Sequence, residues 1–158
     1  MLLISLPVAC QSSDGVTELN DPDFGISATI PATLITQRRL DTLKNSSVLK
    51  SILFTNHSTQ SNYGIVSLKT PYTVNSEILH RYADAIAATN KCTQLSKADT
   101  TLNKLESIRY DFHKCPPFGH KGLSYFIANK QFIYTLTVDY VHENQVISDF
   151  LTSIKIHQ

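Results

Sequence analysis

The chain has 158 residues, and its 14 Lys and Arg against 13 Asp and Glu give a formal charge of +1. This length is typical of a single domain, and a hydrophobic content of 42% excludes wholesale disorder. The near-neutral charge argues against a strongly basic nucleic-acid binder, and no apolar run reaches the roughly 18 residues of a membrane-spanning helix.

The first ten residues resemble a bacterial lipoprotein signal. Residues 1–9 are mostly apolar, like the central region of a signal peptide. The charged segment that opens such a signal is not among them, as expected for a truncated signal whose true start lies upstream. Residues 6–10, Leu-Pro-Val-Ala-Cys, are similar to a lipobox, which implies cleavage before Cys10 and lipid attachment to it. Gln11 implies, by the same resemblance, an outer-membrane lipoprotein facing the periplasm. The alternatives are plain secretion, or a cytosolic protein whose Cys10 is a buried thiol in a first strand.

The next segment has the composition of a flexible tether. Residues 11–15 and 20–23 are rich in Ser, Asn, Asp and Gly and show no apolar periodicity. We therefore expect a signal at residues 1–9, a lipidated tether at 10–23 and one globular domain at 24–158.

Alternating apolar residues predict half-buried strands in the first half of that domain. The first strand covers residues 24–30, and a short extended piece follows at 32–35. The polar residues 38–45 predict a turn or a short helix. Two further strands are expected at residues 48–55 and 63–70, joined by a hairpin loop at 56–62.

Helix signals occur at two places. Asn75 or Ser76 can cap a helix whose apolar residues recur at helical spacing until about residue 89 or 90. Glu143 or Asn144 opens a second helix, and residues 153–156 close it or add a short strand. The apolar stripe of this second helix consists of Val146, Ile147, Phe150 and Leu151.

The segment between the two helices predicts three strands. Residues 91–103 are polar and predict no strand, whereas residues 108–112 alternate and predict one. The clearest hairpin joins residues 122–128 to 131–140 through Asn129 and Lys130. Sequential strands with short connections pair antiparallel, so we expect an α+β domain, an antiparallel sheet covered by two main helices.

In this order, the segments resemble the PsbP-like domains of lumenal photosystem proteins and small bacterial lipoproteins. The similar segments are the strand at 24–31, the helix at 76–83, the hairpin at 125–137 and the ending at 150–156. The resemblance implies an α/β/α arrangement, no cofactor, and a binding or assembly module rather than an enzyme.

The number of cysteines is consistent with an exported protein that contains one disulfide. If Cys10 carries lipid, Cys92 and Cys115 remain as an even pair, and a bridge between them would enclose 22 residues. Such a bridge persists in an oxidising compartment such as the periplasm. The alternative is two free, buried thiols.

One loop offers a metal-binding or enzymatic alternative. His113, Cys115 and His120 are suitable ligands for a soft metal ion, and His113 could serve Cys115 as a base. A disulfide at Cys115 would exclude both roles. Asp111 and Asp139 could support acid/base chemistry, but a solvated sheet face explains them better.

These observations favour a non-catalytic envelope lipoprotein that binds an envelope protein and reaches the membrane through its lipid. Its binding surface would be the open sheet face or the loops around Cys115. Exposed aromatic residues are candidates for this surface, namely Tyr63, Tyr72 and Phe118. The main alternative is a periplasmic carrier of a small apolar ligand held between sheet and helix. A local basic cluster, at Arg38, Arg39, Lys44 and Lys50, is expected to be a solvated face.

Overall fold

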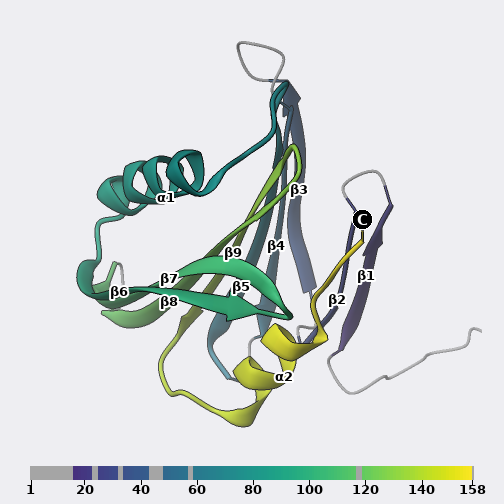
Figure 1. The fold of residues 1–158 in the computed structure, drawn as a ribbon. Helices are drawn as coiled ribbons and strands as arrows, with labels where there is room; N and C mark the ends of the chain where they lie inside the picture. Colours follow the sequence, from purple (N-terminus) through teal and green to yellow (C-terminus); the bar gives the residue numbers. More distant parts are fainter. Residues whose placement is uncertain are drawn as a thin grey trace, which may run out of the picture.

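The computed structural model describes residues 16–22, 25–31, 34–42, 48–56, 59–116 and 119–157. These residues form a seven-stranded sheet, a three-stranded sheet and two helices (Figure 1). The α+β class is confirmed, but strands dominate the structure and a second sheet replaces much of the helical cover that the sequence predicts. Within the described residues, no helix is both long and apolar enough to span a membrane.

The larger sheet is antiparallel throughout. Its strand order is β3-β4-β5-β9-β8-β7-β6. The strands are β3 (Leu34–Thr42), β4 (Val48–Asn56), β5 (Ser61–Lys69), β6 (Thr93–Leu102), β7 (Leu105–Cys115), β8 (His120–Asn129) and β9 (Phe132–Tyr140). The predicted strands at 48–55, 63–70 and 108–112 and the predicted hairpin at 122–140 are confirmed.

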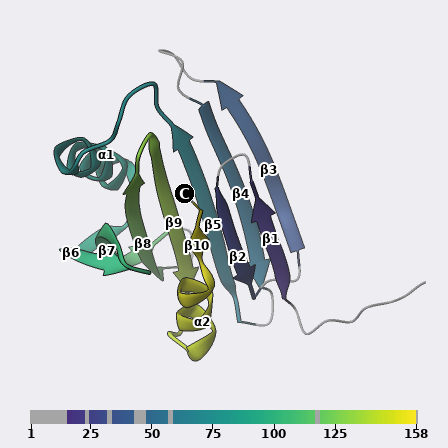
Figure 2. The same cartoon turned by 45° about the vertical axis from the view of Figure 1, so that its right-hand side comes forward.

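One side of this sheet, which we call the covered face, is closed by the smaller sheet and a helix (Figure 2). The smaller sheet consists of β1 (Thr17–Asp21), β2 (Ile26–Ile30) and β10 (Lys155–Ile156), and α2 (Gln145–Ser153) precedes β10. Phe150 of α2 is fully buried and meets Tyr63 of β5 edge to face, with ring centroids 5.0 Å apart. Burial on the same face raises the pKa of Tyr134 to about 12.

A buried ion pair joins the two sheets. Lys50 of β4 binds Asp21 of β1, and the side chains are only 7% and 3% exposed. Removing two charges from water is costly unless they compensate each other, so this pair fixes where β1 lies on the larger sheet.

The opposite side, which we call the α1 face, is packed by α1 (Ser76–Thr89). The helix begins where predicted, because the Asn75 Oδ1 atom accepts a hydrogen bond from the Ile78 N–H at 2.9 Å. Asp84 accepts hydrogen bonds from Lys97 Nζ at 2.7 Å and from the Tyr110 hydroxyl. These two hydrogen bonds lower the pKa of Asp84 and tie the helix to β6 and β7.

Three predictions about local structure are wrong. β1 lies within the expected tether at 10–23, where its backbone pairs with β2. The expected turn or short helix at 38–45 is mostly β3, paired along β4. The polar segment at 91–103 contains β6, an edge strand whose residues are mostly exposed, so no apolar alternation marks it. Cys10, Phe24 and Phe118 lie outside the described residues.

Candidate functional site

The α1 face carries a pocket of about 480 Å³ where α1 ends and β6 begins. Its walls come from the end of α1, a disulfide, β7, β8 and β9. The lining residues are Thr89, Asn90, Lys91, Cys92, Phe112, Cys115, Pro116, Gly122, Ser124, Thr137 and Asp139. We call it the disulfide-side pocket.

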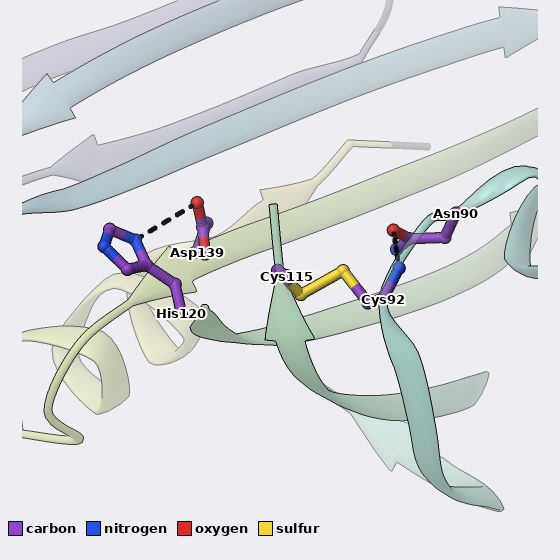
Figure 3. The surroundings of a disulfide bond; sticks show 5 residues. All are labelled: Asn90, Cys92, Cys115, His120 and Asp139. Carbon is purple, nitrogen blue, oxygen red and sulfur yellow. Dashed lines mark hydrogen bonds and ion pairs between the residues drawn. A yellow bond between two sulfur atoms is a disulfide. The ribbon is translucent and has the colours of Figure 1, made fainter. Parts of the chain in front are cut away.

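The predicted bridge between Cys92 and Cys115 is present and forms one wall of this pocket. Figure 3 shows the bridge joining the segment after α1 to the end of β7. Asn90, the C-cap of α1, positions the first cysteine, because its Oδ1 atom accepts a hydrogen bond from the Cys92 N–H at 3.2 Å. The bridge therefore links the end of the helix to the sheet covalently.

Local backbone features bring the second cysteine into the same wall. The β7–β8 register shifts between Phe112 and Cys115, and Lys114 between them has a φ of 54°. A Cβ on Gly122 would stand 3.1 Å from Cys115 Sγ and 3.4 Å from Phe112 Cβ. Glycine at this position leaves the room that the disulfide needs.

The floor of the pocket is polar. Ser124 of β8 lies opposite Thr137 of β9, and Gly122 lies opposite Asp139. The Asp139 Oδ2 atom lies 3.5 Å from His120 Nδ1, a pair visible beside the disulfide in Figure 3. The Asp139 Oδ1 atom is shielded from solvent and takes no hydrogen bond from any described residue. The pocket thus presents hydroxyls and a carboxylate on its floor, an ammonium at its rim and an aromatic ring beside the disulfide.

The disulfide removes Cys115 from the metal or enzyme hypothesis built on His113, Cys115 and His120. Cys115 is oxidised, so it supplies neither a thiolate ligand nor a nucleophile. His113 follows Phe112 along β7, and because successive side chains alternate, the two project to opposite faces. Across the described ranges, no three His, Cys, Asp or Glu side chains are close enough to hold a metal ion.

The two carboxylates considered for acid/base chemistry are not brought together. Asp111 pairs in register with Leu123, whose side chain belongs to the covered face, whereas Asp139 lies on the α1 face. Arg109 Nη2 donates to Asp111 Oδ1 at 2.7 Å, and Ser96 donates to Asp111 Oδ2 at 2.7 Å. Burial acts to raise the pKa of Asp111, but these hydrogen bonds outweigh it and lower the pKa, so Asp111 is an ion-pair partner.

The predicted aromatic binding surface needs one correction. Tyr63 is fully buried against Phe150 on the covered face and is unavailable to a partner. Tyr72 is 52% exposed, as the prediction requires, and Phe118 lies outside the described residues. Lys50 of the expected basic cluster is likewise buried with Asp21 rather than solvated.

Sequence reasoning named the loops around Cys115 but missed most of the pocket. Its floor residues lie on β8 and β9, and only the pairing register of these strands brings them together. In the sequence, their polar side chains predict a solvent-exposed face rather than a pocket. The alternation of small and hydroxyl residues on β8 and β9, against apolar neighbours, was the available signal.

No family model matches the chain, and no curated protein matches it in sequence. Among solved structures, the chain is similar to the cyanobacterial PsbP protein (CyanoP) from Synechocystis sp. PCC 6803, determined in solution. The TM-score is 0.55, the sequence identity is 9%, and the similarity covers 98% of this chain and 99% of that one. At this identity the likeness shows the fold alone, so the chain has a PsbP-like fold.

Proposed function

We propose that the protein is a non-catalytic binding module whose binding site is the disulfide-side pocket. The observation that carries this proposal is the convergence of the disulfide wall, the polar floor and the Lys91 rim around about 480 Å³ on one face. Pockets that bind ligands or partner side chains combine apolar walls with a few placed polar groups.

The chemistry of the site favours binding over catalysis. Its cysteines are bonded to each other and are unavailable for attack. The floor groups, Ser124, Thr137 and Asp139, are suited to accept hydrogen bonds from a partner, and Ser124 can also donate its hydroxyl hydrogen. The Thr137 hydroxyl already donates to the Gly64 carbonyl at 3.4 Å. A rigid wall and fixed strands reduce the ordering cost of association.

We further propose that the module works at the bacterial envelope, as an outer-membrane lipoprotein facing the periplasm, with an envelope protein as its partner. The lipobox-like residues 6–10 and the disulfide support this location. The intact mass from the native host, measured without reduction, tests it. We expect loss of residues 1–9, an acyl mass on Cys10, and no alkylation of Cys92 or Cys115. An unprocessed chain would refute the lipoprotein proposal while leaving the pocket untouched.

Site-specific photo-crosslinking tests the binding site itself. A photoreactive residue at Lys91, on the pocket rim, should capture one partner in the native host, whereas the same residue at Lys104 should not. Lys104 is an exposed residue in the turn between β6 and β7, at the end of these strands opposite the disulfide.

A matched pair of α1 variants makes this test specific. Thr89→Trp places a bulky ring at the pocket rim, while Ala88→Trp places it on the neighbouring exposed position outside the pocket. We expect the Lys91 crosslink to survive Ala88→Trp and to disappear in Thr89→Trp. Equal crosslinking in both variants would show that the partner binds elsewhere.

A further inference from the structure

A second cavity, of about 370 Å³, lies between the first half of α1 and the sheet. Its floor is apolar, because Leu68 of β5 and Ile133 of β9 face each other in register and both are buried. Ile78, Arg81 and Tyr82 form the helix wall, and their three- and four-residue spacing places them on one side of α1. Thr70 and Tyr72 complete the lining. We call it the helix-side cavity.

The rim of this cavity is held by hydrogen bonds. The Thr70 N–H donates to the Gln131 carbonyl at 2.8 Å, and the Val74 N–H donates to the Lys130 carbonyl at 2.7 Å. The Thr70 hydroxyl lies 2.5 Å from the Tyr72 carbonyl, to which it donates. The segment that carries Tyr72 is therefore fastened to the β8–β9 turn, which preorganises the rim for a ligand.

The polar groups of the cavity are few, and only one of them is charged. Arg81 is the only charged residue of the lining, is exposed, and has no ion-pair or hydrogen-bond partner within the described ranges. Tyr82 packs edge to face on Phe126, with centroids 6.1 Å apart, and burial raises its pKa, so its phenol stays neutral. An apolar floor with two phenol rings and one unpaired guanidinium fits a ligand that has an apolar body and a single negative end.

We propose that the helix-side cavity binds a small aromatic or aliphatic monocarboxylate. The carboxylate pairs with the Arg81 guanidinium, whose planar fork matches both oxygens. The apolar body lies on Leu68 and Ile133, between the rings of Tyr72 and Tyr82. The volume is near the lower end of the range for ligand pockets, which suits a compact molecule. This inference differs from the purely apolar ligand expected from the sequence, and it does not depend on the disulfide-side pocket.

Titration of the full, oxidised chain with phenylacetate and with its neutral isostere phenylacetamide tests the proposal. Backbone amide chemical shifts should change saturably at residues 68–82 and around Ile133, with phenylacetate binding at least about tenfold more tightly than the amide. Equal affinity for the acid and the amide would overturn the proposal, as would shift changes confined to the disulfide-side pocket.

Two variants that each remove one exposed positive charge make the test specific to Arg81. Arg81→Gln should weaken phenylacetate binding about tenfold or more, because the anion loses its charged partner. Lys104→Gln, which removes an exposed cation that lines neither pocket, should leave the affinity unchanged. Both positions are exposed, so folding should be retained, which the amide spectrum of each variant checks directly. Equal loss in the two variants would indicate nonspecific charge attraction and would refute the assignment to Arg81.

Discussion

The two faces of the seven-stranded sheet differ in what covers them. The covered face is sealed by a second sheet and α2, which bury aromatic and aliphatic side chains in one continuous core. The α1 face is packed by one helix, and both the disulfide-side pocket and the helix-side cavity open beside that helix. The two faces of one sheet therefore differ in role. Burial of the covered face stabilises the fold, and the incomplete cover of the α1 face leaves concave surface for binding.

The interactions that attach the covering elements to the sheet also differ between the two faces. On the covered face, contacts between buried rings and the buried Lys50–Asp21 pair hold the layers together. On the α1 face, exposed polar links supplement a smaller apolar core, with Asp84 binding Lys97 and His80 Nε2 lying 3.4 Å from Asp99 Oδ1. Five experiments test this contrast, beginning with the largest expected effect.

Truncating the central ring of the covered face should be the most damaging change. Phe150→Ala removes a fully buried ring and should lower the free energy of unfolding by about 3–5 kcal/mol. Ile86→Ala, at a 39% exposed position of α1, should cost less than about 1 kcal/mol. Denaturant titration measures both values, and similar costs would contradict the contrast between the faces.

Breaking the buried ion pair should cause the second-largest loss of stability. Asp21→Ala leaves the Lys50 ammonium without this carboxylate in a buried site and should cost about 3 kcal/mol or more. Because a buried pair can often be replaced by apolar residues, Asp21→Leu combined with Lys50→Met should recover most of that loss. Additive losses in a double-mutant cycle would mean that β1 is not fixed by this pair.

Removing the disulfide should test the α1 face. Cys92→Ala with Cys115→Ala should cost about 3 kcal/mol, because the unfolded chain loses its cross-link, and reduction of the native protein should have the same effect. Amide exchange should rise more in β6 than in β2, since the bridge holds the edge strand. Equal increases in both strands would show that the two faces open together.

Alkaline pH should weaken the covered face through the ionisation of Tyr134. The pKa of Tyr134 is raised to about 12 in the folded chain, against an ordinary value near 10. The folded state therefore holds this proton more tightly, so its contribution is complete below about pH 10 and is lost as the pH rises toward about 12. That contribution amounts to about 2–3 kcal/mol, and Tyr134→Phe should remove this part of the alkaline loss. An unchanged pH slope in the variant would assign the loss to other tyrosines.

Acid pH should have a smaller effect on the α1 face. The pKa of Asp84 is lowered, so its stabilising contribution is present at neutral pH and is lost as the pH falls below about 4 through the folded-state value. Asp84→Asn should cost under about 1 kcal/mol at neutral pH, because the pair is largely exposed, and this difference should vanish in acid. Lys97→Gln should produce the same loss, and the double variant should add little.

The sequence predicts the regular, apolar parts of this fold well. Capping by Asn75, together with the spacing of Leu79 and Ala83, identifies α1, and the alternation along β8 and β9 identifies the central hairpin. The sequence does not predict β6, because an exposed edge strand has no buried face that would impose an apolar period of two on its residues. Likewise β1 is short and polar, and only its pairing with β2 and the contact between Asp21 and Lys50 reveal its place.

The candidate sites are less predictable for a related reason. Cysteine counting anticipates the disulfide, but it does not reveal that Gly122 and Asp139 stand beside it, because register between distant strands decides that. Tyr63 illustrates the converse error, since an aromatic on a strand is equally compatible with either face until the second sheet is known.

The disulfide also changes how the chain would respond to a pulling force. Cys92 and Cys115 are 23 positions apart, so force applied at the two termini passes through the sulfur bridge and bypasses the β6–β7 hairpin. An extended chain spans about 3.5 Å per residue, so the oxidised protein should lengthen by roughly 75–80 Å less than the reduced protein when stretched to its full contour. Under tension, the β6–β7 hairpin beside the disulfide-side pocket carries no force, so it can keep its turn while the other strands of the sheet are extended.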